Sequence, residues 1–106
     1  MSERLIQLKE MLADDPKDSF LCFAIAKEHE KLGNLEEALE MYLVLKGNDP
    51  EYVGLYYHLG QLYEILEQHE NALKVYDEGI QIAKKQSDFH ALSELNGVKT
   101  NLEMEL

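Results

Sequence analysis

The side chains best suited to catalysis in this 106-residue chain are one cysteine, Cys22, and four histidines. A cysteine and a histidine within hydrogen-bonding reach can act as nucleophile and base. Cys22 and His29 are 7 residues apart, which on one helix places them about 10 Å apart along the axis, too far to hydrogen-bond. Free cysteine is also among the most buried residue types. We therefore expect Cys22 in the core, His29 hydrogen-bonded between helices, and a chain that is not an enzyme.

A metal site on a helix would need its ligands on one face. The histidines include no pair spaced i, i+3 or i, i+4, so no two share a face as ligands; they are His29, His58, His69 and His90. The acidic cluster at 36–40 is better explained as the first turn of a helix, where carboxylates are favoured by the helix dipole. The glycines are scattered singly and form no phosphate-binding loop. We expect no metal and no cofactor.

Composition restricts the partners. The chain has 21 acidic and 10 basic residues and a formal net charge of −11, which argues against nucleic acid and favours partners with basic segments. The longest apolar run, Phe20 to Ala26, is far shorter than the ~20 residues that span a bilayer. One cysteine agrees with a reducing cytoplasm, and the first residues lack a signal-peptide core. We expect one cytoplasmic domain over 1–106, with no membrane or nucleic-acid partner.

A 34-residue repeat organises the middle of the chain. Pro16 and Pro50, the only prolines, are 34 residues apart, and residues 16–49 align with 50–83 without a gap. Each segment carries two apolar stripes at helical spacing, which predicts two antiparallel helices per repeat. The identical pairs are Pro16/Pro50, Leu21/Leu55, Glu30/Glu64, Leu32/Leu66, Glu36/Glu70, Ala38/Ala72, Leu39/Leu73 and Tyr42/Tyr76.

Turn residues separate these stripes. Gly33 suits the left-handed position past a helix end, and Asn34 with Glu37 predicts a capping box on the next helix. The corresponding turn of the second repeat, 67–69, has no glycine. At the outer junctions, Asp15-Pro16 and Asp49-Pro50 predict an aspartate cap followed by proline in the first helical position.

This pattern resembles the tetratricopeptide repeat family. The resemblance rests on the 34-residue period, on the closing prolines and on Tyr56, Leu59, Gly60, Tyr63, Ala38, Tyr42, Ala72 and Tyr76. Small residues at Ala26/Gly60 and at Ala38/Ala72 would let paired helices approach closely. The chain departs from the family pattern at Cys22, Gly79 and Lys84. The resemblance implies an all-α fold, a right-handed superhelix of antiparallel helix pairs.

The two ends predict further helices that cap the repeats. Residues 1–15 carry the stripe Leu5, Leu8, Met11 and Leu12, which predicts a helix at 2–13. In 84–106, Ser87-Asp88 can cap a helix at 88–104 that carries Ala91, Leu92, Leu95, Val98 and Leu102. The repeat register would place polar residues on the packing stripe there, so this segment is not a third regular repeat. A repeat array needs such a terminal helix to cover its last apolar face.

A helical wheel places a second set of residues away from the packing stripes. In the repeat family, this side of each first helix lines the concave groove that holds peptides or partner helices. The predicted partner-binding groove consists of Phe20, Phe23, Lys27, Tyr57, His58 and Gln61. An alternative for Phe20 and Phe23 is that they only cover the N-terminal helix.

The expected function is binding a peptide or helix of a partner protein in this groove. The family's clamp for the terminal carboxylate of a chaperone tail needs several basic groove residues. Lys27 is the one cation among the matching first-helix positions Phe23, Lys27, Tyr57 and Gln61, so that clamp is not expected. The alternative function is a self-associating scaffold, a homo-oligomer formed through the Phe20/Phe23 face or the terminal helix.

Overall fold

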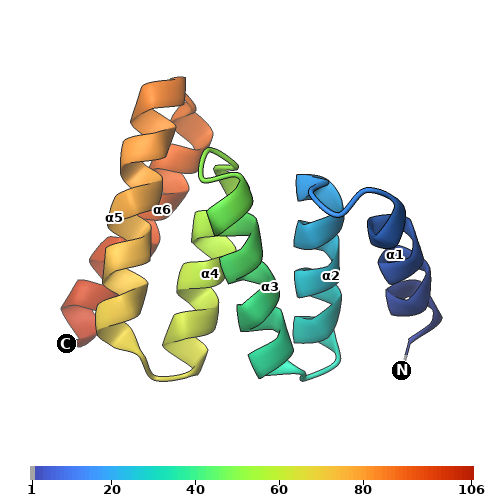
Figure 1. Ribbon diagram of the computed structural model, residues 1–106. Helices are drawn as coiled ribbons and strands as arrows, with labels where there is room; N and C mark the ends of the chain where they lie inside the picture. The colour runs from blue at the N-terminus through green and yellow to red at the C-terminus, as the bar shows by residue number, and fades with distance from the viewer. Residues whose placement is uncertain (1) are drawn as a thin grey trace. The chain divides into compact units, whose positions relative to one another are not determined.

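The computed structural model describes residues 2–106, which form six α-helices joined by short turns. The helices are α1 Glu3–Asp14, α2 Ser19–Lys31, α3 Leu35–Asn48, α4 Gly54–Ile65, α5 His69–Gln86 and α6 Phe89–Glu105 (Figure 1). No strand occurs within residues 2–106, and the predicted all-α class is confirmed. In that part of the chain, no helix is long and apolar enough to cross a membrane.

The chain divides into two compact units after Tyr52. The first unit contains α1, α2 and α3, and the second contains α4, α5 and α6. Within each unit, consecutive helices run antiparallel (Figure 1). The predicted repeat 16–49 supplies α2 and α3, and the repeat 50–83 supplies α4 and most of α5.

In the first unit, α1 packs on α2 through a small apolar cluster. Leu5 and Leu8 of α1 are buried in one cluster with Leu21, Ala24 and Ile25 of α2. Leu12 and Met41 pack against this cluster and are partly buried. Removing these side chains from water is the main favourable contribution to the association of α1 with the α2–α3 pair.

In the second unit, α6 completes the core that α4 and α5 begin. Leu95 and Leu102 of α6 are almost fully buried. The helix begins where the sequence predicts, because Asp88 Oδ1 accepts a hydrogen bond of 3.0 Å from the Ala91 amide and caps it. The predicted C-terminal helix is therefore confirmed, as α6. The core residues of α4 and α5 are Leu55, Tyr56, Leu59, Leu62, Ala72, Val75, Tyr76, Ile80 and Ala83.

Two glycines allow the helices of the second unit to approach closely. A Cβ atom on Gly60 would overlap the ring of Tyr76, and one on Gly79 would lie 2.5 Å from Tyr56 Cβ. Gly79, a departure from the family pattern, is thus required by the neighbouring Tyr56. Ala38 and Ala72 are fully buried between their helices, where a larger side chain would have to displace the packing.

The same tyrosine–glutamate hydrogen bond occurs in both units. The Tyr42 hydroxyl donates to the Glu30 carboxylate between α3 and α2, and the Tyr76 hydroxyl donates to Glu64 between α5 and α4. Both tyrosine side chains are fully buried, and a buried hydroxyl without a partner costs about 1–3 kcal/mol. The identical residues Glu30/Glu64 and Tyr42/Tyr76 of the repeat are therefore the acceptor and the donor of one hydrogen bond that occurs in both units.

The turns inside the repeats use left-handed residues at the same aligned position. Gly33 has φ +80°, and Glu67 has φ 60° without the freedom of glycine. Asn34 is the N-cap of α3 as predicted, but its side chain caps no amide of the described chain. Its Nδ2 instead lies 3.3 Å from His29 Nδ1. The predicted capping box with Glu37 is wrong, because the buried imidazole takes the asparagine as its hydrogen-bond partner.

The Asp-Pro pairs end helices and do not begin them, so the predicted aspartate caps are wrong. Asp15 and Asp49 are the C-caps of α1 and α3. Proline is common just past a C-cap because it cannot continue the preceding helix. The cap of α2 is Asp18, whose Oδ1 accepts from the Leu21 amide at 2.9 Å.

The outer ends of two apolar stripes are less buried than their periodicity predicts. The N-terminal helix predicted at 2–13 is α1, one residue later at each end. Met11 is 55% exposed and Leu32 is 41% exposed, although both lie on predicted packing stripes. Met11 and Leu32 lie near the ends of their stripes, where the neighbouring helices cover less surface, so these residues remain partly in water.

Gly60→Ala should destabilise the protein, because its methyl group has no room beside the Tyr76 ring. We expect a loss of about 1–3 kcal/mol, measured as a lower melting temperature by circular dichroism. Gly97→Ala is the matched control, since a Cβ there meets nothing within 4 Å; alanine should raise stability by up to ~1 kcal/mol through helix propensity. Equal melting temperatures for the two variants would contradict the close approach of α4 and α5.

Candidate functional site

The six residues predicted to form a groove lie on α2 and α4. Phe20, Phe23 and Lys27 belong to the first unit, and the remaining three belong to the second. That the two sets form one groove stays a prediction.

A pocket of about 620 Å³ lies along α2, with the first turn of α1 at its edge. It brings together Phe20, Phe23 and Lys27, the three predicted residues of the first unit. Its volume lies within the range of about 300–1,000 Å³ that is usual for ligand pockets. The full lining is Phe20, Phe23, Ala24, Lys27, Glu28, Glu30 and Lys31 from α2 and Arg4 from α1.

The two phenylalanines of this pocket have different surroundings. Phe20 is 64% exposed. Phe23 is half-buried, with its ring centroid 6.2 Å from that of Tyr42 and 5.5 Å from that of Tyr52. The cluster that receives α1 consists of other α2 residues. Covering the N-terminal helix therefore does not account for Phe20.

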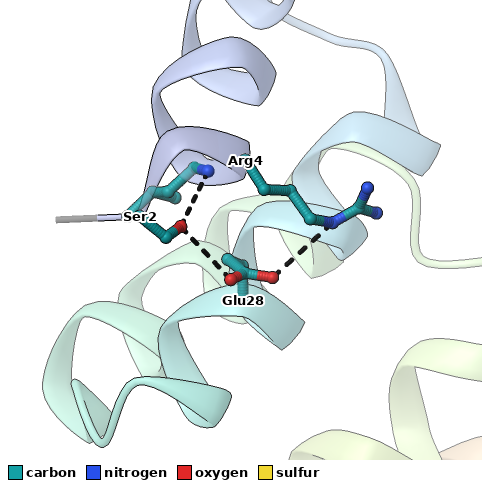
Figure 2. Close-up of polar contacts among 4 residues, drawn as sticks. Ser2, Arg4 and Glu28 are labelled. Carbon is teal, nitrogen blue, oxygen red and sulfur yellow. Dashed lines mark hydrogen bonds and ion pairs between the residues drawn. The ribbon is translucent and has the colours of Figure 1, made fainter.

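A buried carboxylate fixes the edge of the pocket. The Glu28 side chain is only 7% exposed, yet it accepts a hydrogen bond of 3.2 Å from Ser2 Oγ and pairs with Arg4 Nε at 3.5 Å (Figure 2). Ser2 Oγ also accepts from the Leu5 amide and so caps α1. A buried charge needs such partners. The ion pair with Glu28 holds Arg4, whose side chain is 63% exposed, at the edge of the pocket.

Sequence reasoning missed Arg4 and Glu28. The repeat alignment could have indicated Glu28, because it aligns Glu28 of the first repeat with Leu62 of the second. Leu62 is fully buried in the second unit. A glutamate at an aligned core position indicates a carboxylate with a specific partner, although the alignment does not say which residue that partner is.

In the second unit, the predicted site residues make contacts along α4. Tyr57 and His58 are half-buried, and their rings meet edge to face with centroids 5.3 Å apart. Gln61 Nε2 donates to the Tyr76 hydroxyl at 2.6 Å and to Glu64 Oε2 at 3.2 Å. Gln61 is thus held by the tyrosine–glutamate pair of its own unit, and Tyr57 and His58 are left as the partly accessible rings of this face.

The two side chains considered for catalysis, Cys22 and His29, are both buried among the helices. Cys22 is buried as predicted, and burial, with a smaller contribution from Asp18, raises the pKa of its thiol. Burial and the nearby Lys9 ammonium lower the pKa of His29, so it is neutral at pH 7. Within residues 2–106, no group of three or more His, Cys, Asp or Glu side chains is placed to hold a metal ion.

Comparison with known families identifies the repeat. The profile of the family described as Tetratricopeptide repeat matches residues 21–51 and 53–86, more than half of the chain. These two matches overlap the two repeats found in the sequence, 16–49 and 50–83, and each begins and ends a few residues later. No curated protein matches the chain.

Solved structures agree with this assignment. A tetratricopeptide repeat domain protein from Salinibacter ruber is 43% identical, with a TM-score of 0.80 over 84% of this chain and 90% of that one. A Bordetella parapertussis protein is 22% identical, with a TM-score of 0.85 over 99% and 91%. The TPR2B domain of yeast Sti1, solved as a complex with pHsp70, is 17% identical, with a TM-score of 0.88 over 96% and 82%. The last two show the fold alone.

The two buried tyrosines should make stability fall in alkali. Burial, and then the hydrogen bonds to Glu30 and Glu64, raise the pKa values of Tyr42 and Tyr76 well above their ordinary value. In the unfolded chain, tyrosine phenols ionise near pH 10. The stabilisation of the folded state by Tyr42 and Tyr76 is therefore fully present below that pH and is lost as the pH rises further.

Urea unfolding from pH 8 to about 11.5 measures this effect. The variant Tyr42→Phe/Tyr76→Phe should be less stable at pH 8, because it lacks both hydrogen bonds, but should lose less stability above pH 10. The same decline with pH in both proteins would show that these phenols do not control alkaline unfolding.

Proposed function

Because the chain belongs to the tetratricopeptide repeat family, whose members generally bind other proteins, we propose that it binds a peptide or helix of a partner protein through the pocket along α2. Phe20 carries this proposal. Its ring is 64% exposed at a pocket of about 620 Å³ and is not needed for packing. Exposed rings of this kind are characteristic of interface anchors.

The residues around Phe20 suit the binding of a partner segment. Phe23 is fixed against Tyr42 and Tyr52, so it offers a rigid apolar wall that loses little entropy on binding. Lys27 and Lys31 carry ammonium groups at the same pocket and can donate to carbonyl oxygens of a bound backbone. An apolar side chain of the partner enters the pocket, and these donors hold its main chain.

The second unit carries candidate binding residues of its own. Tyr57 and His58 present partly accessible rings on α4, and Gln61 lies one turn further along the same helix. The similar yeast domain is solved as a complex with pHsp70, which is consistent with this class of function. We place the protein in the cytoplasm, where a single free thiol such as Cys22 stays reduced.

Phe20→Ala should weaken binding of a partner segment about thirtyfold, which corresponds to ~2 kcal/mol for a central aromatic anchor. The binding partner for the test is a peptide selected on the intact protein from a random displayed library, and its affinity is measured by titration calorimetry. Phe20→Ala should leave the melting temperature unchanged because the ring is exposed.

Phe89→Ala is the matched control, since that ring is 75% exposed on α6 of the other unit. Its affinity should equal that of the unchanged protein. Selected peptides that bind both variants equally well would place the binding surface elsewhere. Phe23→Ala should weaken binding and also lower the melting temperature, because Phe23 packs on two tyrosines.

Self-association is the second candidate function, favoured by the exposed Phe89 and Met104 of α6. Sedimentation velocity at several concentrations separates the two functions. A monomer at all concentrations supports the partner-binding module, and a concentration-dependent dimer that Phe89→Ala abolishes supports the scaffold.

A further inference from the structure

The first unit has a second concave surface, separate from the pocket along α2. This furrow, of about 530 Å³, is lined by residues of α1 and α3 with His29 of α2 between them. Four residues of α3, at 37, 40, 41 and 44, recur at i, i+3, i+4 and i+7, so they form one flank of the helix. The lining is Leu5 and Lys9 from α1, His29 from α2, Glu37, Glu40, Met41 and Val44 from α3, and the α3 N-cap Asn34.

The shape of the furrow suits a helix. From Asn34 to Val44 the lining follows about three turns of α3, roughly 15 Å at the rise of an α-helix. Its apolar part consists of Leu5, Met41 and Val44, and Val44 is 49% exposed. Met41 and Val44 lie three residues apart on one flank of α3, with Glu37 and Glu40 on the preceding turns, so the apolar face of an amphipathic helix can pack there.

The charge of the furrow selects the kind of helix. Glu37 and Glu40 lie on its α3 side, and Lys9 is the one cation among its lining residues. His29 adds no charge at pH 7, because burial and Lys9 lower its pKa, outweighing Glu37 and Glu28. The whole chain has a formal net charge of −11, which attracts a basic segment and repels a second copy of the protein.

We propose that the furrow between α1 and α3 docks a basic amphipathic helix of a partner protein. Apolar residues of that helix cover Val44 and Met41, and its lysine or arginine side chains pair with Glu37 and Glu40. This surface is independent of the Phe20 pocket, so a partner can use either surface without the other.

The test uses a capped helical peptide of about 18 residues, long enough to form a helix on binding. It is built from Leu, Ala and Lys, with Leu at i, i+3, i+4 and i+7, and a matched peptide carries Glu in place of Lys. Amide chemical shifts of the full chain are followed by NMR. The Lys peptide should shift amides at 37–44 and 5–9, and the Glu peptide should shift none.

Variants distinguish binding at the furrow from general attraction by the negative charge of the protein and from binding at the Phe20 pocket. Glu37→Lys/Glu40→Lys should weaken binding of the Lys peptide at least tenfold, whereas Glu67→Lys/Glu70→Lys, the same charge change at exposed acids of the second unit, should have little effect. Val44→Ser should also weaken binding, and Phe20→Ala should not. Equal loss in the two charge variants, equal binding of the two peptides, or shifts confined to the Phe20 pocket would overturn the proposal.

Discussion

A buried tyrosine that donates to a glutamate on the preceding helix fixes each repeat. The ring of Tyr76 lies where Gly60 has no side chain, and its hydroxyl reaches Glu64 four residues further along α4. A fully buried phenol must find an acceptor, so the ring and the carboxylate together set how far α5 slides along α4. The same bond, Tyr42 to Glu30, recurs in the first unit. The 34-residue spacing therefore repeats a register as well as a set of apolar positions.

That register determines which side of α2 is left for binding. The packing face of α2 is occupied by α3 and α1, and Glu28 accepts a hydrogen bond from Ser2 and pairs with Arg4. The opposite side, with Phe20 and the two lysines, lines the pocket. Tyr42 links the fold to this surface, because the residue that bonds Glu30 also supports the ring of Phe23. The Phe23 wall of the proposed binding pocket thus rests on the contact that holds the helix pair together.

Local periodicity predicted most of the fold, and long-range contacts account for what it missed. The repeat predicted four of the helices and the turn at Gly33, and the terminal apolar stripes predicted α1 and α6. The residue type alone predicted the burial of Cys22. The Asp-Pro pairs were misinterpreted, because one aspartate can end a helix or begin the next, and only the backbone geometry distinguishes the two. Arg4 and Glu28 are far apart in sequence, so no helical spacing connects them. Phe20, Phe23 and Lys27 were predicted together because they share one helix face, whereas their pairing with α4 residues requires knowledge of both units and stays a prediction.

A double-mutant cycle tests most directly whether the tyrosine–glutamate bond holds each repeat. Unfolding free energies at pH 7 are measured for Tyr76→Phe, Glu64→Ala and the double variant, and the same cycle is built on Tyr42 and Glu30. A hydrogen bond to a charged group should give a coupling of about 1.5–3 kcal/mol in both units. Effects that add to within about 0.5 kcal/mol in both cycles would contradict this account, since the repeats would then be held by apolar packing alone.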